Sequence, residues 1–194
     1  MRRIIVFNSV TLDGVMQAPG RPDEDTRGGF QHGGWAAPFA DPEMGKAAGE
    51  NMATTEGLLL GRRTYEDFYK VWPNRTDNPF TEILNNSPKY VASTKLKEPL
   101  PWMNSILLKG NAVDAVAKLK KESGKDLVIL GSGVLIQSLM KHNLIDEYTL
   151  LIHPLILGTG TRMFADGLSA TLRLVNSKTS STGVVIATYR PVEK

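Results

Sequence analysis

Cysteine is absent from the 194-residue chain, which excludes disulfides, thiolate zinc sites and cysteine nucleophiles together. This absence fits a reducing compartment. Long apolar runs are absent as well: the opening segment MRRIIVFNSV has only four apolar residues before Asn8, too few for a signal-peptide core. No run approaches the roughly 20 apolar residues that span a bilayer. We therefore predict a cytoplasmic protein without a membrane partner.

A large excess of one charge is also missing. The 23 Lys and Arg residues outnumber the 20 Asp and Glu residues only slightly, and they are spread along the chain. A nucleic-acid partner is therefore not expected, although a local anion site is compatible with this charge. The three histidines, His32, His142 and His153, lack the paired spacing of metal ligands, so we predict no metal site and a structural role for each.

Apolar segments of strand length alternate with helical patterns, which predicts a single α/β domain over residues 1–194 with a largely parallel sheet. The expected strands are Ile4 to Ser9, Gly57 to Leu60, Lys89 to Ala92, Ser105 to Leu108 and Leu127 to Leu130. The expected helices are Pro42 to Ala53, Thr64 to Lys70, Pro79 to Asn85, Ala112 to Glu122 and Gly133 to Lys141.

The pattern changes after Ile145. The segments DEYTLLIHPLIL and GVVIATYR predict two longer strands with a loop-rich stretch between them. Because GVVIATYR alternates apolar and polar residues, we expect these two strands to form an antiparallel pair at the edge of the sheet.

Residues 17–42 form one long segment that is rich in glycine, proline and charge, yet holds Phe30, Trp35 and Phe39. Loops longer than about 12 to 15 residues are usually functional lids or disordered. The aromatic residues favour a lid that packs on the domain. Trp35 would then either stack on a planar substrate or anchor the loop.

Two expected strands end in turns suited to anions. In LVILGSGVLIQSL, a buried strand runs through Gly131, Ser132 and Gly133 into a helix, whose first N–H groups would converge on one spot that can hold phosphate. The alternative is a tight turn without a ligand. In GRRTYEDF, Arg62 and Arg63 follow another strand end in the same way.

The alternative for GRRTYEDF is that Thr64 and Asp67 form a capping pair and the arginines are simply solvated. In an open α/β sheet, however, ligands bind beyond the carboxyl ends of the strands, so both turns would face one crevice. A third strand end brings Ser93, Thr94 and Lys95 to the same edge. Basic residues there favour a 2′-phosphate, and hence NADP over NAD.

The segments FNSVTLDGVMQ, GRRTYEDF, VAST and ILGSGVLIQSLMKHNLIDEYTLLIHPLILGTGTRMF resemble the dihydrofolate reductase-like superfamily in order and spacing. The chain is most similar to stand-alone relatives of the reductase domain of the bifunctional riboflavin-biosynthesis deaminase/reductase. This resemblance implies a three-layer fold with helices on both faces of a mostly parallel sheet, bound NADPH and a homodimer. The deaminase half needs cysteine ligands for zinc, so the chain corresponds at most to the reductase half.

The resemblance also implies roles for individual residues. Those expected at the cofactor are Ser9, Val10 and Met16 beside the nicotinamide, Gly61, Arg62, Arg63 and Thr64 with nearby Ser93 and Thr94 at the adenosine-side phosphates, and Gly131, Ser132, Gly133 and Val134 at the pyrophosphate.

On the substrate side, Asp13 either acts on the substrate or forms a turn with Gly14. Gly158 and Gly160 either let the backbone approach a ligand or serve a bulge. Folate reductases of the superfamily use a carboxylate after the first loop, and the long insertion leaves Asp41, Glu43 and Glu50 as unassigned candidates, which makes folate doubtful.

The leading hypothesis is an NADPH-dependent reductase that transfers hydride to a C=N or C=O carbon of a small heterocyclic or sugar-like substrate. Three alternatives stay open: pterin reduction of the dihydrofolate reductase type, a non-catalytic NADP-binding module, and an enzyme that binds phosphate sugars without a nicotinamide.

Overall fold

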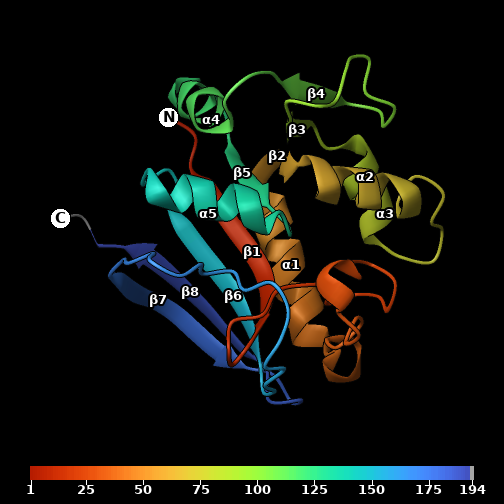
Figure 1. Ribbon diagram of the computed structural model, residues 1–194, viewed down its shortest axis with the longest axis vertical. Coiled ribbons are helices and arrows are strands. Elements are labelled where there is room, and N and C mark those ends of the chain that lie inside the picture. The colour runs from red at the N-terminus through yellow and green to blue at the C-terminus, as the bar shows by residue number, and fades with distance from the viewer. Residues whose placement is uncertain (193–194) are drawn as a thin grey trace.

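The computed structural model describes residues 1–192 and shows an eight-stranded mixed sheet with the order β4-β3-β2-β5-β1-β6-β8-β7 (Figure 1). The strands are β1 (Ile4–Thr11), β2 (Thr55–Gly61), β3 (Lys89–Ala92), β4 (Ser105–Leu108), β5 (Asp126–Ile129), β6 (Glu147–His153), β7 (Leu172–Thr179) and β8 (Val185–Pro191). The strands β4, β3, β2, β5, β1 and β6 are parallel to one another, whereas β8 runs antiparallel to both β6 and β7.

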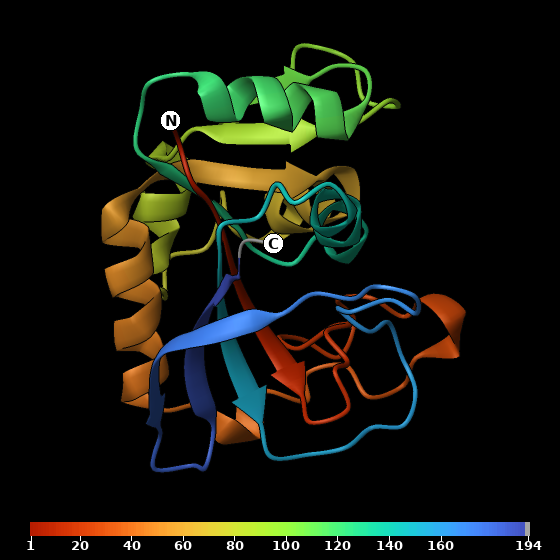
Figure 2. The ribbon, with the colours of Figure 1, turned by 90° about the vertical axis from the view of Figure 1, so that its left-hand side faces the viewer.

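Helices cover both faces of the sheet, as the α/β pattern predicted. They are α1 (Pro42–Thr54), α2 (Arg62–Val71), α3 (Phe80–Asn86), α4 (Ala112–Lys121) and α5 (Gly133–Lys141). One core cluster joins the sheet to α4 and α5, and a second joins the opposite face to α2 and α3 with Met52 of α1 at its border. Figure 2 shows α1 and α5 on opposite sides of the sheet. The predicted three-layer fold is confirmed.

The prediction for the C-terminal third was wrong in two respects. Strand β7 occupies part of the stretch that was expected to be loop-rich, and GVVIATYR forms β8 in the interior of the sheet rather than at its edge. Strand β6 runs parallel to β1 and antiparallel to β8. Strand β7 could not be predicted from the sequence, because most of its side chains are exposed and apolar residues do not need to alternate along it.

The segment 17–42 packs on the domain as a lid with two short 3₁₀ turns, Arg27–Gly29 and Ala37–Phe39. Its core contains Val15, Ala18, Phe30 and Trp35, all of them buried. Trp35 Nε1 donates a hydrogen bond of 2.7 Å to the carbonyl oxygen of Gln17. The lid is therefore folded against the sheet end by its own aromatic residues.

No helix within residues 1–192 has the length and hydrophobicity that crossing a bilayer requires. The cytoplasmic location and the homodimer stay predictions.

Candidate functional site

The candidate site lies at the carboxyl edge of the sheet, which is the row of carboxyl ends of β3, β2, β5, β1 and β6. Strand β1 pairs with β5 only as far as Val6 and Ile129, but with β6 as far as Thr11 and His153. Beyond Val6, the side of β1 that faces β5 is therefore unpaired. Such a divergence of neighbouring strands is where open α/β sheets bind ligands.

The turn from β5 to α5, residues 131–133, borders this divergence. Asn8 of β1 holds it with both side-chain atoms: Oδ1 accepts a hydrogen bond from the Gly131 N–H at 2.6 Å, and Nδ2 donates to the Gly131 carbonyl oxygen at 3.2 Å. Ser132 Oγ accepts the Gly61 N–H at 2.9 Å, and Thr64 Oγ1 accepts the Ser132 N–H at 3.0 Å. The turns after β2 and β5 are thus bonded to each other.

These bonds settle the local role of two predicted residues. Thr64 does not form the alternative capping pair with Asp67, because its hydroxyl binds Ser132 and Asp67 binds Arg21 of the lid. Ser132 takes a left-handed conformation with φ 58°, and its hydroxyl is occupied by protein partners.

The glycines of this turn let its backbone pack closely against α2 and the segment after β1. Gly131 has φ 61°, and a Cβ placed on it would lie 3.1 Å from Thr64 Cγ2. A Cβ on Gly133 would lie 2.8 Å from Met16 Sδ. The first N–H groups of α5, including that of Val134, have no acceptor within the helix. A backbone surface with positive partial charge therefore faces the divergence.

A cavity of about 420 Å³ continues the carboxyl edge across the ends of β3 and β4. We call it the cationic cavity, and its lining residues are Arg62, Ala92, Ser93, Thr94, Lys95, Gly110, Asn111, Ala112, Val113 and Ser138. Within residues 1–192, Arg62 pairs only with Glu66, one turn along α2, at 2.6 Å. Lys95 makes no ion pair within residues 1–192. The cavity therefore combines two cations with hydroxyl and amide groups, a chemistry that suits phosphate.

The structure brings most of the predicted cofactor residues together along this edge. Arg62, Ser93 and Thr94 line the cationic cavity, while Gly61 and Thr64 contact the turn at 131–133. Arg63 is exposed and does not line the cavity.

The residues expected beside the nicotinamide lie on or just after β1. Val10 and Met16 are buried in the core cluster that faces α5, so Val10 can offer only backbone to a ligand. Ser9 is partly buried and lies on the part of β1 that pairs with β6 but not with β5.

Asp13 is bound within the protein. It accepts hydrogen bonds from the Thr11 hydroxyl at 2.6 Å and from the N–H groups of Leu157 and Gly158 at 3.2 and 2.8 Å. These donors, Thr11 first, lower the pKa of Asp13 to about 2. A carboxylate with this pKa stays ionised and joins the turn after β1 to the loop after β6.

Gly160 and Trp35 serve the packing of the lid. A Cβ on Gly160 would lie 2.6 Å from a ring carbon of Phe30 and 2.9 Å from Val15 Cγ1. Trp35 is 6% exposed and its ring meets His153 edge to face with centroids 5.1 Å apart. With no free face, Trp35 anchors the loop.

The acidic candidates around α1 have other partners. Asp41 caps α1 by accepting the Glu43 N–H and also binds Ser181. Glu43 pairs with Lys178 of β7, and Glu50 is exposed. The structure brings none of these three carboxylates to the turn at 131–133.

The histidines occupy separate environments. His153 is fully buried between Trp35 and Phe39, and burial lowers its pKa to about 4. The His142 ring donates from Nδ1 to the Ser138 carbonyl oxygen at 2.9 Å. Over residues 1–192, no group of three or more His, Asp or Glu side chains is placed to hold a metal ion.

The site residues that sequence reasoning missed include Asn8, Gly110, Asn111 and Ser138. A signal existed for Gly110 and Asn111, because they follow the expected strand Ser105 to Leu108 and so reach the same edge. Ser138 lies inside a helix, and only packing brings it to the cavity.

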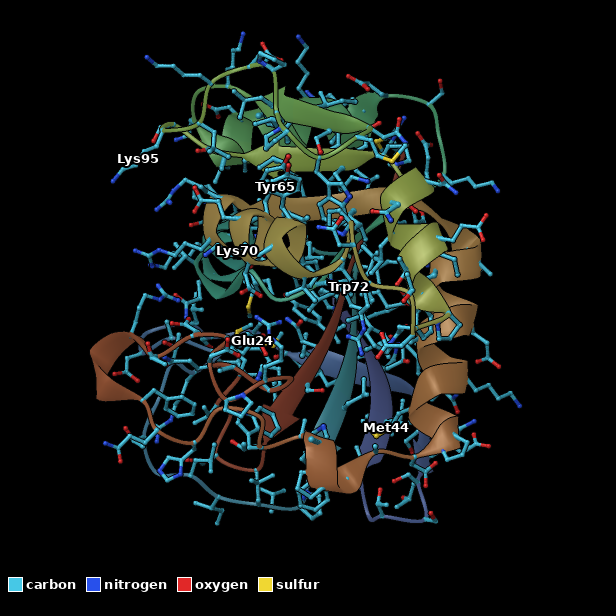
Figure 3. All side chains as sticks on the ribbon, turned by 90° about the vertical axis from the view of Figure 1, so that its right-hand side faces the viewer. Glu24, Met44, Tyr65, Lys70, Trp72 and Lys95 are labelled. Atoms are coloured by element: carbon cyan, nitrogen blue, oxygen red, sulfur yellow. The ribbon has the colours of Figure 1, made fainter. Side chains whose placement is uncertain are left out.

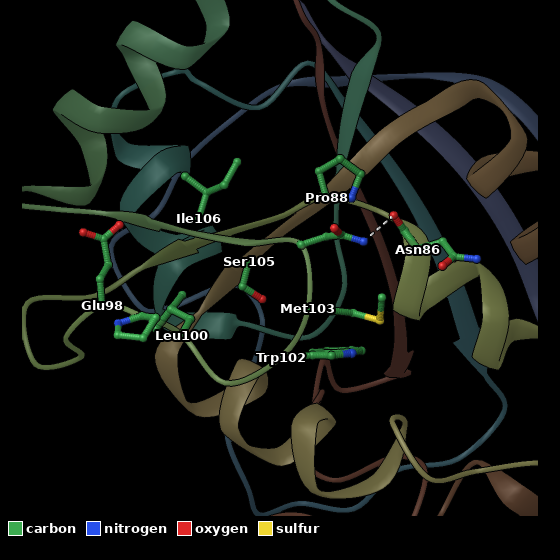
Figure 4. A pocket seen from close by; sticks show the side chains of 10 residues that line it. Asn86, Pro88, Glu98, Leu100, Trp102, Met103, Ser105 and Ile106 are labelled. Atoms are coloured by element: carbon green, nitrogen blue, oxygen red, sulfur yellow. Dashed lines mark hydrogen bonds between the residues drawn. The ribbon is translucent and has the colours of Figure 1, made fainter.

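A larger cavity, of about 720 Å³, lies beside the edge strand β4 and contains none of the predicted site residues (Figure 4). Its walls include Pro88, Leu100, Met103 and Ile106, with Glu98 as the one charged residue that lines it. Because it offers no cation and lies toward the amino ends of β3 and β4, it does not suit a phosphorylated ligand.

A family model described as the RibD C-terminal domain matches residues 2–186. The protein YyaP of Bacillus subtilis (strain 168), itself uncharacterized, is 33% identical over 97% of this chain and 94% of its own length.

Two solved structures share the fold. One is a candidate riboflavin biosynthesis protein from Shewanella sp. PV-4, with a TM-score of 0.69, 24% identity and coverage of 99% of this chain and 100% of the other. The second is dihydrofolate reductase from Enterococcus faecalis in complex with NADP(H), with a TM-score of 0.64, 16% identity and coverage of 98% and 97%. The similarity to dihydrofolate reductase extends over the whole fold.

Proposed function

Because the chain belongs to the RibD C-terminal domain family, we propose that it is an NADPH-dependent reductase. Its substrate would be a small heterocyclic or sugar-like compound with a C=N or C=O group, similar to the substrate of 5-amino-6-(5-phosphoribosylamino)uracil reductase. The reductase character rests on the family and on the reductases among the structural neighbours. The cofactor and the substrate class rest on the geometry described above.

The observation that carries the proposal is that the cationic cavity and the turn at 131–133 are neighbours at the carboxyl edge. Arg62 lines the cavity, and its helix begins at Gly61, which is bonded to Ser132 of that turn. One elongated ligand can therefore place a phosphate beside Arg62 and Lys95 and a second phosphate group at the first N–H groups of α5. A dinucleotide with a 2′-phosphate has this arrangement of charges.

The residues present fit such a cofactor. Gly131 and Gly133 carry no side chain at the start of α5, which is the property that lets backbone N–H groups approach a pyrophosphate closely. When bound, NADPH supplies a hydride at C4 of its nicotinamide. The protein would hold the two ends of the cofactor, position the substrate carbon and exclude water.

Pterin reduction receives less support. Asp41 and Glu43 are bound to Ser181 and Lys178, and the exposed Glu50 is not brought to the turn at 131–133, so none of the three stands where a carboxylate would hold a pterin as in folate reductases. The contacts of these carboxylates therefore favour riboflavin-type reduction over pterin reduction.

Titration with NADPH and NADH, followed by fluorescence, tests the proposal. We expect micromolar binding of NADPH and at least tenfold weaker binding of NADH, because a charge-assisted contact to the extra phosphate contributes about 1.5 to 3 kcal/mol. Equal or absent binding of the two nucleotides would contradict it. Binding of NADPH without oxidation by aminouracil ribosylamine, pterin or quinonoid substrates would favour a non-catalytic module.

A further inference from the structure

We propose that Glu24, on the lid, is the acid that protonates the substrate during reduction. This inference rests on the proposed reductase function. It identifies a residue that neither the family resemblance nor the motifs indicated, because Glu24 lies inside the long segment at 17–42.

The position of Glu24 follows from the contacts of its turn. Arg21 Nη2 of the same turn reaches α2 and binds Asp67 Oδ1 at 2.8 Å. In the view of Figure 3, Glu24 lies below α2, the helix that Arg21 binds. The lid turn therefore lies against the helix that begins beside the turn at 131–133.

The chain just before the lid segment also lies against the turn at 131–133. Met16, immediately before the lid, is so close to Gly133 that a Cβ there would meet its sulfur at 2.8 Å. Thr64, one turn before Asp67 on α2, binds the Ser132 N–H. The lid turn thus closes over the end of the cofactor site that is opposite the cationic cavity, where the nicotinamide and substrate are expected.

The bonding of Glu24 leaves one oxygen for chemistry. Oε2 accepts the N–H groups of Gly20 at 2.7 Å and Arg21 at 3.1 Å. Oε1 makes no hydrogen bond to residues 1–192. One oxygen therefore fixes the carboxyl group to the lid backbone, and the second is free to carry a proton.

The electrostatics favour a protonated carboxyl group. Burial raises the pKa of Glu24, the two backbone donors lower it, and the negative charge of Asp67 raises it while Arg21 lowers it, with a net rise. Asp23 is exposed in the same turn and pairs with Arg21 at 3.5 Å. By contrast, hydrogen bonds lower the pKa of Asp13 and of Asp41. A raised pKa suits an acid that must give up its proton near neutral pH.

The reduction balances with Glu24 in this role. The substrate carbon receives a hydride, which carries both electrons, from the reduced nicotinamide, and the π bond of the C=N or C=O group opens toward the heteroatom. The heteroatom takes the proton as the O–H bond of Glu24 breaks. The carboxylate that forms is partly exposed and regains its proton from solvent.

The test uses the charge of the cofactor and needs no substrate. The oxidised nicotinamide ring carries a positive charge that the reduced ring lacks, so an ionised Glu24 beside it favours NADP⁺ over NADPH. The Kd ratio of NADP⁺ to NADPH is measured by calorimetry from pH 5 to 8. The 2′-phosphate titrates in the same range, but it is common to both nucleotides and cancels in the ratio.

In the wild-type protein we expect the ratio to fall about threefold to tenfold as Glu24 ionises. Glu24→Gln keeps an oxygen that accepts the Gly20 and Arg21 N–H groups, so the lid turn stays folded while the titration disappears. The Kd ratio of NADP⁺ to NADPH for Glu24→Gln should therefore not change with pH. Asp23→Asn is the matched control, because it removes an adjacent carboxylate that is 84% exposed, and it should behave like the wild type.

A pH response that persists in Glu24→Gln would overturn the role of Glu24 and leave the reductase proposal intact. A response that is lost equally in Asp23→Asn would also overturn it, because the effect would then belong to the general charge of the lid. Failure of either nucleotide to bind would instead refute the proposed function, and this inference with it.

Discussion

Two Arg-Arg pairs stand at opposite edges of the same sheet and have opposite environments. Arg2 and Arg3 precede β1 at the amino edge, whereas Arg62 and Arg63 follow β2 at the carboxyl edge. Arg2 is 7% exposed, pairs with Glu56 at 3.2 Å and donates to the Tyr90 hydroxyl at 3.1 Å. Arg62 has only its helical neighbour Glu66, and Arg63 makes no ion pair within residues 1–192.

The difference separates structural cations from binding cations. At the amino edge, carboxylates and carbonyl oxygens from distant segments neutralise each basic group. Arg3, for example, pairs with Asp126 and Glu147. At the carboxyl edge the basic groups have few protein partners, so their charge is available to a ligand. Under the proposed function, identical dipeptides would serve stability in one place and recognition in another.

Replacing Arg2 should have the largest effect on stability. Arg2→Met keeps the apolar stem but leaves Glu56, Tyr90 and the Ser123 carbonyl oxygen without their donor, and we expect a loss of about 3 kcal/mol in the free energy of unfolding. Urea denaturation measures the loss. Arg3→Met is the control, because its side chain is 44% exposed and should contribute about 1 kcal/mol or less.

The NADPH affinity of the Arg2→Met protein tests whether Arg2 also takes part in binding. The NADPH affinity of the folded Arg2→Met protein should stay unchanged. If Arg2→Met lost NADPH affinity but kept its free energy of unfolding, the distinction between structural cations at the amino edge and binding cations at the carboxyl edge would be wrong.

Replacing Arg62 should affect binding instead. We expect Arg62→Ala to weaken NADPH by about 1.5 to 3 kcal/mol, roughly 10- to 150-fold, and to leave NADH almost unchanged. The free energy of unfolding should change by less than about 0.5 kcal/mol, because the pair with Glu66 is a partly exposed helical pair. Calorimetry and urea denaturation measure the two effects.

Arg63→Ala sharpens this comparison, because Arg63 is adjacent but does not line the cationic cavity. Its effect on NADPH should be smaller than that of Arg62→Ala. Equal losses for NADPH and NADH in Arg62→Ala would mean that this arginine does not recognise the extra phosphate.

Asp13 shows that an anion at the carboxyl edge has protein hydrogen-bond donors even where the cations there have few partners. Its response to acid should be the smallest of these effects. Its pKa is lowered from 3.8 to about 2 in the folded protein, so the unfolded chain takes up the proton first as the pH falls. The stability that Asp13 contributes is therefore present above about pH 4 and is lost toward pH 2.

Asp13→Asn removes this titration, so its free energy of unfolding should fall less between pH 4 and pH 2 than that of the wild type. Urea denaturation at several pH values in this window measures the difference. Parallel curves for the two proteins would show that the Asp13 carboxylate is not held by Thr11 and Gly158 as described.

The parallel strands could be predicted from the sequence with good boundaries. Lys89–Ala92 and Ser105–Leu108 coincide with the expected segments, because short uniform apolar runs between turns leave few alternatives. Strand β1 extends two residues beyond the expected end at Ser9, since its pairing with β6 continues through Thr11. Strand β7 could not be predicted, because a strand whose side chains are mostly exposed needs no apolar pattern.

The site was predictable where it depends on strand ends. Arg62 and Ser93 follow directly after parallel strands and Gly131 comes two residues after one, and such positions share one edge whatever the details of packing. Glu24 and Asn8 were not predictable in this way. Their roles depend on a lid that folds back over 20 residues and on a strand that continues past its neighbour.

The sequence by itself determined which side chains and glycines stand at the ends of the parallel strands, because local pattern and strand polarity are sufficient for that. Only the tertiary structure decided which of those charges are neutralised. Arg2 meets Glu56 and Ser123, and Asp13 meets Gly158, across separations that no local pattern encodes. The physical reason is that the state of a charge depends on its burial and on its partners, and distant segments supply both.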